Sequence, residues 1–164
     1  MFDPTTLVGL HTWLSLVAIA AGLPAVAGLL GGRVRPGWTA AYLASATATS
    51  VSGFLLPFTG FLPSHAFGIV SLLLLAPAAY GFWIRGLGGR WRRFHDVALT
   101  ISLYLLLFVG VVQAFLKVPA LHALAPTQTE PSFAIPQAVL LVACAAVLWR
   151  CLRRPTSAGI SAPA

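Results

Sequence analysis

Long stretches without a charged residue dominate this sequence. They cover residues 4–32, 36–84, 97–116 and 132–149, so that the charges are confined to the short segments between them and at the chain ends. A helix that crosses a membrane needs about 20 mostly apolar residues. Three of the stretches suit one such helix each, whereas residues 36–84 are long enough for two helices joined by a tight turn. The pattern therefore predicts five membrane-spanning helices.

The composition excludes an ordinary soluble domain. Only 8% of the residues are charged and 59% are hydrophobic, whereas soluble domains carry about 25% charged residues. We therefore predict an all-α fold, an integral membrane bundle that forms a single transmembrane helical domain over residues 1–154. A disordered cytoplasmic tail is predicted over residues 155–164. The five predicted spans cover about residues 7–30, 38–56, 65–83, 94–115 and 133–149.

The basic residues predict how the bundle is oriented. All nine arginines fall on one side of the predicted spans, in the segments around residues 33–35, 85–93 and 150–154, and Lys117 falls on the other side. Basic residues accumulate on the cytoplasmic side of membrane proteins. The N-terminus is therefore predicted outside and the C-terminus in the cytoplasm. The net charge of +7 is explained by this topology and by anionic lipid headgroups, so nucleic acid is not expected as a partner.

The second predicted span is the most polar of the five. Ser45, Thr49 and Ser52 recur at helical spacing and share one face. Small hydroxyl residues on one face allow helices to approach closely. We expect this face to pack against a neighbouring helix, and a polar pore lining is the alternative.

Four residues at the predicted outer side are candidates for binding a ligand. His11 and His65 lie at the outer ends of the first and third spans, Gln113 lies at a similar depth, and His122 lies in the loop after the fourth span. Imidazoles from two helices can ligate haem iron axially, and a third can complete a transition-metal site. The cofactor predicted on this basis is haem b or a transition metal, held by His11 and His65 with His122 as a third metal ligand. The competing interpretations are interfacial histidines without a ligand, which we favour from the sequence, and contact with a quinone or another small molecule.

A dense polar run marks the predicted inner side, from Trp91 to Asp96. We expect its arginines in a glycine-rich loop, and Asp96 in the first turn of the fourth span, where a carboxylate is favoured by the helix dipole. Asp96 can pair with Arg92, Arg93 or a protonated His95. A His95–Asp96 pair facing the bundle can relay protons, but topology and helix capping are the interpretation that we favour.

Four short motifs resemble a family of uncharacterised bacterial predicted membrane proteins. They are a histidine near the start of the first span, Ser-Gly-Phe near the end of the second, Pro-x-His opening the third, and Arg-Trp-Arg-Arg-Phe-His entering the fourth. The resemblance covers roughly residues 7–113 and carries over His11, His65 and His95 as family-like positions. It implies a multi-pass protein of the bacterial inner membrane, and it implies no known activity.

Catalytic residues are scarce. The chain has three acidic residues, which leave no paired carboxylates for general acid–base chemistry, and no serine stands in a nucleophile motif. We therefore do not expect an enzyme. The predicted function is a structural, assembly or accessory subunit of a membrane complex, with the lipid bilayer, other membrane subunits or further copies of the chain as partners. The alternatives are a haem- or metal-binding redox or carrier protein and a small oligomeric transporter.

Overall fold

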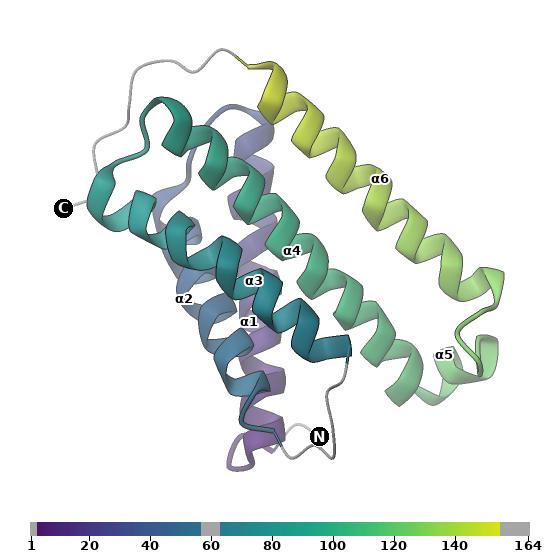
Figure 1. The fold of residues 1–164 in the computed structure, drawn as a ribbon. Helices are drawn as coiled ribbons and strands as arrows, with labels where there is room; N and C mark the ends of the chain where they lie inside the picture. Colours follow the sequence, from purple (N-terminus) through teal and green to yellow (C-terminus); the bar gives the residue numbers. More distant parts are fainter. Residues whose placement is uncertain (1–2, 57–62, 155–164) are drawn as a thin grey trace.

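Five long helices alternate in direction along the chain (Figure 1). The computed structural model describes residues 3–56 and 63–154, and these residues form helices and no strand. Residues 57–62 of the predicted turn and the predicted tail at 155–164 lie outside the described residues. The helices are α1 (Leu7–Leu30), α2 (Pro36–Gly53), α3 (Pro63–Tyr80), the π-helical turn η1 (Gly81–Arg85), α4 (Gly89–Lys117), the short α5 (Pro119–Leu124) and α6 (Pro131–Arg153).

Four of the helices are long and apolar enough to cross a membrane. They are α1, α3 together with η1, α4 and α6, and their length and composition support a membrane protein. Helix α2 has 18 residues, and its many small and hydroxyl side chains keep it less apolar than the other four. The nine arginines gather at one end of the bundle, which we call the arginine end, and Lys117 lies at the opposite end together with α5.

Helix α1 packs through its smallest residues. Ala18, Ala21, Gly22 and Ala25 are buried and recur every three or four positions along one face. A Cβ atom on Gly22 would lie 2.7 Å from a Leu103 methyl group. Small residues of this kind let the backbones of membrane helices approach closely, and α1 accordingly packs most extensively against α2 and also contacts α4.

The polar face of α2 points into the bundle. Ser45, Thr49 and Ser52 are all buried, and the Ser45 and Ser52 hydroxyls donate to carbonyl groups of their own helix. Nearby, the hydroxyl groups of Tyr42 and Ser102 are hydrogen-bonded at 2.8 Å and join α2 to α4. The predicted packing role of this face is confirmed for Ser45 and Ser52. Thr49 also lines the cavity described below.

Helix α4 begins five residues before the predicted start, so the arginines expected in a loop are helical. Glycines still form the connection, and the positive φ of Gly86 and Gly89 suits them to it. Asp96 lies in the second turn of α4, not the first. There it pairs with Arg92 four residues earlier, a spacing that brings the two side chains together only on a helix.

Two further differences concern the segment after α4. Residues 118–132 were expected to form a loop, but α5 occupies residues 119–124 and α6 starts at Pro131. A proline suits the first position of a helix because its missing N–H has no partner there, and Pro119 and Pro131 take this position. Two of the prolines in this segment therefore begin helices.

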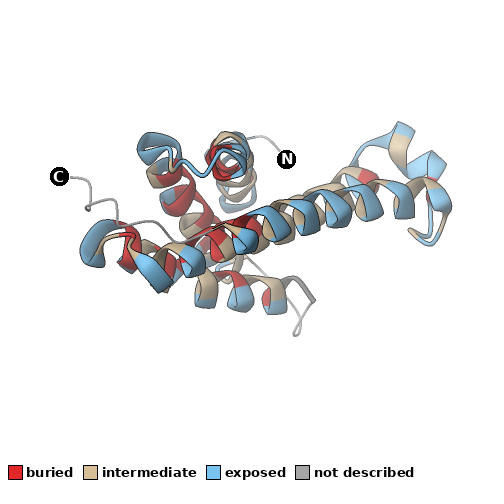
Figure 2. Cartoon of the chain, turned by 90° about the horizontal axis from the view of Figure 1, so that it is seen from above, coloured by how far each residue is buried: buried red, intermediate tan, exposed pale blue. Residues whose placement is uncertain are grey.

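Helix α6 lies at the edge of the bundle. It contacts α4 and α1, and Cys151 is its one buried residue. Figure 2 shows buried residues where the other long helices meet, whereas the α5 end of the molecule is mostly exposed or half-buried. The core therefore lies among α1 to α4, and most residues of α6 are exposed.

Candidate functional site

A cavity of about 570 Å³ lies between α1, α2, α3 and α4, towards the end opposite the arginines. Pockets that bind small molecules have volumes of about 300–1,000 Å³. Most of the lining is aliphatic or aromatic, and small residues such as Gly53, Gly68 and Gly110 leave the space open. The polar side chains that line it include His11, His65, Thr49, Gln113 and Lys117.

His11 is held against the last turn of α2. Its Nδ1 lies 3.0 Å from the Ser52 hydroxyl oxygen, and a Cβ atom on Gly53 would lie 3.4 Å from the imidazole Cε1. The Ser52 hydroxyl in turn donates to the Thr49 carbonyl at 3.0 Å. The backbone of α2 therefore fixes the position of the ring and leaves its other side towards the cavity.

His65 approaches the same turn of α2 from α3. It is buried, and the centre of its ring lies 5.7 Å from that of Phe54. The Phe54 ring also covers Gly68, where a Cβ atom would lie 3.1 Å from it. The two histidines thus contact neighbouring residues, Gly53 and Phe54, at one end of α2.

The structure brings together three of the predicted site residues and separates the others. His11, His65 and Gln113 line one cavity. His122 is exposed on α5 and does not line it, because α5 turns away beyond the end of α4. His95 and Asp96 lie at the arginine end, as the sequence predicted.

These positions decide how well the predicted cofactors fit. Among the described residues, no three histidine, cysteine or acidic side chains form a group that could hold a metal ion, so the predicted metal site with His122 as third ligand is not assembled. A haem with two axial imidazoles requires only His11 and His65, and both line the cavity. Among the described residues that line the cavity, Lys117 is the one Lys or Arg side chain, so few groups are available there to pair with the haem propionates.

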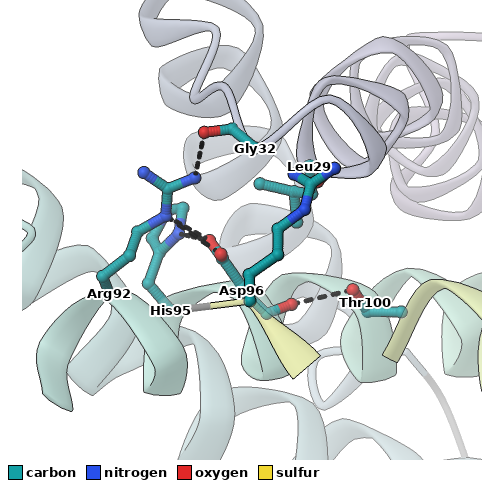
Figure 3. A network of polar contacts seen from close by, with 7 residues as sticks. Leu29, Gly32, Arg92, His95, Asp96 and Thr100 are labelled. Atoms are coloured by element: carbon teal, nitrogen blue, oxygen red, sulfur yellow. Dashed lines mark hydrogen bonds and ion pairs between the residues drawn. The ribbon is translucent and has the colours of Figure 1, made fainter. Parts of the chain in front are cut away.

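At the arginine end, Asp96 is the centre of a polar network (Figure 3). Arg92 Nε lies 2.9 Å from each carboxylate oxygen of Asp96, and the same guanidinium donates to the Gly32 carbonyl at 3.0 Å. His95 Nδ1 lies 3.1 Å from Asp96 Oδ1. The predicted pairing of Asp96 with Arg92 is therefore confirmed, and Arg92 connects α4 to the end of α1.

The His95 ring is fully buried. It stacks on Phe82 with the ring centres 6.0 Å apart, and its Nε2 has no hydrogen-bond partner among the described residues. An ionised carboxylate only accepts hydrogen bonds, so Nδ1 carries the proton in this pair. His95 does not line the cavity, and its contacts suit a packing role at the junction of η1 and α4.

Arg150 in the last turn of α6 and Arg154 directly after this helix cap the end of α1, a role that the sequence did not reveal. Arg154 donates to the Leu29 and Leu30 carbonyls, and Arg150 donates to Leu30 at 3.4 Å. The last carbonyls of a helix lack partners within it and carry partial negative charge, so cations are favoured there. Gly32 has a positive φ, and a Cβ atom there would lie 2.5 Å from Arg154 Nη1, so glycine leaves room for the cap.

Comparisons of the chain with protein-family models, with curated proteins and with solved structures find no match. The resemblance to uncharacterised bacterial membrane proteins therefore stays a prediction. The functional argument depends on the geometry of the cavity.

Proposed function

We propose that this protein is a five-span membrane protein that binds a small lipophilic molecule in the cavity between α1 and α4. The observation that carries the proposal is the shape and lining of that cavity. A space with mostly apolar surface and several polar side chains in its lining suits a molecule with an apolar body and a polar head. Ionisable residues at membrane depth are costly and often functional, and His11 and His65 border the same space.

The proposed membrane position adds α2 as the fifth span. Its 18 residues correspond to about 27 Å at 1.5 Å per residue, close to the roughly 30 Å of a bilayer core. Its hydroxyl-bearing face is buried against the other helices, so the lipid would meet mainly apolar side chains. The arginine end would face the cytoplasm, which places the cavity in the outer half of the membrane.

Cysteine labelling tests this orientation. In a variant without Cys144 and Cys151, a cysteine at Thr127 should react with a membrane-impermeant thiol reagent added to intact cells. A cysteine at Gly88 should react only after the cells are opened. The reverse pattern would contradict the proposed orientation, and reaction of both in intact cells would contradict a membrane lying between the two ends.

Filling the cavity tests the binding function. Gly110 lines the cavity, and a Cβ atom there meets only an Ile19 methyl at 3.7 Å, so Gly110→Leu should occupy the space without forcing the helices apart. We expect the wild type, extracted with its surrounding lipid by an amphipathic polymer, to retain a lipophile enriched over the membrane background. We expect Gly110→Leu to retain at least about tenfold less, the loss for about 1.4 kcal/mol of binding free energy.

The matched control is Gly37→Leu, since nothing lies within 4 Å of a Cβ atom at Gly37. Mass spectrometry and absorption spectra of the extracts identify the bound molecule. Haem is the second candidate, favoured because His11 and His65 line the same cavity, and it would appear as a Soret band in these spectra. Equal retention by Gly110→Leu and wild type, or no enrichment in either, would contradict the proposal. The accessory-subunit and transporter roles stay predictions.

A further inference from the structure

Two hydroxyl groups near His11 already donate their protons to backbone carbonyl groups. The Thr12 hydroxyl donates to the Val8 carbonyl at 2.8 Å, and the Ser15 hydroxyl donates to the His11 carbonyl at 2.8 Å. Both side chains line the cavity. A hydroxyl has one proton and two lone pairs, so these oxygens can only accept a further hydrogen bond.

The His11 ring also offers a hydrogen-bond acceptor, because of its contact with Ser52. The Ser52 hydroxyl uses its proton on the Thr49 carbonyl, so it can take part in the 3.0 Å contact with His11 Nδ1 only as an acceptor. With the Ser52 proton on the Thr49 carbonyl, Nδ1 is the donor in this contact. In a neutral imidazole the other nitrogen then has a free lone pair, which makes Nε2 an acceptor.

Donors in the lining include the Thr49 hydroxyl, which has no hydrogen-bond partner among the described residues, and two groups of α4. Lys117 and the Gln113 amide belong to the last turns of α4, whereas Leu75, Leu105 and Leu106 supply apolar surface. Around His11, the lining thus presents three acceptors, His11 Nε2 and the Thr12 and Ser15 hydroxyl oxygens, beside the Thr49 hydroxyl, which can donate or accept. A ligand head with only carbonyl oxygens would leave these acceptors unpaired, at a cost that a hydroxyl head avoids.

We infer that the cavity takes a lipophile whose head donates a hydrogen bond, an alcohol, phenol or quinol, with His11 Nε2 as the acceptor. This inference rests on the proposed function and specifies the class of ligand. It also assigns Ser52, which does not itself line the cavity, as the positioning residue that fixes the His11 tautomer.

A quinol and its quinone provide matched probes, since they share one tail and differ in the two hydroxyl protons. The protein, labelled with ¹⁵N at its four histidines, is placed in lipid nanodiscs under anaerobic conditions. The nitrogen chemical shifts report the tautomer directly, with His11 assigned by its loss in His11→Asn. Partition of radiolabelled short-tailed benzoquinol and benzoquinone between protein-containing and empty nanodiscs measures binding.

We expect His11 as the Nδ1–H tautomer, an Nε2 shift on addition of quinol, and quinol binding about tenfold tighter than quinone binding, as for one hydrogen bond to a buried acceptor. His11→Asn keeps a donor for Ser52 but removes Nε2, so the preference should fall to about one, whereas His122→Asn should keep it. An Nε2–H tautomer in the wild type, equal affinities or a quinone preference would overturn the inference while the cavity proposal stands. If neither probe binds, the inference fails, and the Gly110→Leu extraction decides the proposed function independently.

Discussion

Replacing Asp96 with alanine is expected to destabilise the protein by about 3 kcal/mol, as for a largely buried ion pair that loses one partner. The side chains of Arg92 and Asp96 are only 15% and 11% exposed, so Arg92 would keep its charge with no counterion in contact. His95 Nδ1 would lose its acceptor in the same substitution. Unfolding by SDS in mixed micelles, followed by circular dichroism, measures the change.

Two control variants separate the ion pair from general damage at this end. Arg93 is exposed, so Arg93→Met should change the unfolding free energy by less than about 0.5 kcal/mol, as for ordinary surface substitutions. The double variant Arg92→Met/Asp96→Leu should recover much of the loss, because an apolar pair leaves no uncompensated charge. A loss below about 1 kcal/mol in Asp96→Ala would show that water already reaches this network.

The substitution Gly22→Ala is expected to lower stability by about 2 kcal/mol, in the range found for overpacked cores. The added methyl would lie 2.7 Å from a Leu103 methyl and 2.8 Å from the Tyr42 ring. Leu103 can rotate, but Tyr42 is fully buried and its hydroxyl is bonded to Ser102, so α1 must move outward. The same SDS titration measures the effect.

Gly37→Ala is the matched control, with the same chemical change in an open position near the start of α2. Alanine favours a helix over glycine by up to about 1 kcal/mol, so this variant should be neutral or slightly more stable. The difference between the two variants isolates the cost of packing. If Gly22→Ala were as stable as Gly37→Ala, the close approach of α1, α2 and α4 at Gly22 would not contribute to the stability of the bundle.

The positions of the long helices could be predicted because apolar length and charged borders act locally. Helix α1 has the predicted bounds, and the Thr6 hydroxyl accepts a hydrogen bond from the Gly9 amide at its start. The beginning of α4 could not be predicted in the same way, because glycine and arginine are as common in loops as near helix ends. Its first turns are connected to the bundle by the hydrogen bond from Arg92 to the Gly32 carbonyl, a contact that spans 60 residues of sequence.

The candidate site was predictable only in part. Depth along the predicted spans correctly placed His11, His65 and Gln113 in one region, since a residue's depth follows from its position in a span. Depth does not say which way a loop turns, so His122 was wrongly grouped with them. The cavity itself arises from small residues on facing helices, and the sequence alone does not say which glycines face each other.

The arginine cap on α1 has a consequence for the order in which the chain is made. The Leu29 and Leu30 carbonyls accept from Arg154, some 125 residues later. During synthesis, α1 is therefore made well before the arginine that caps it, and its last carbonyls need other partners, such as water, until α6 follows. The segment around Arg154 therefore completes the end of α1, which couples the assembly of α1 to that of α6.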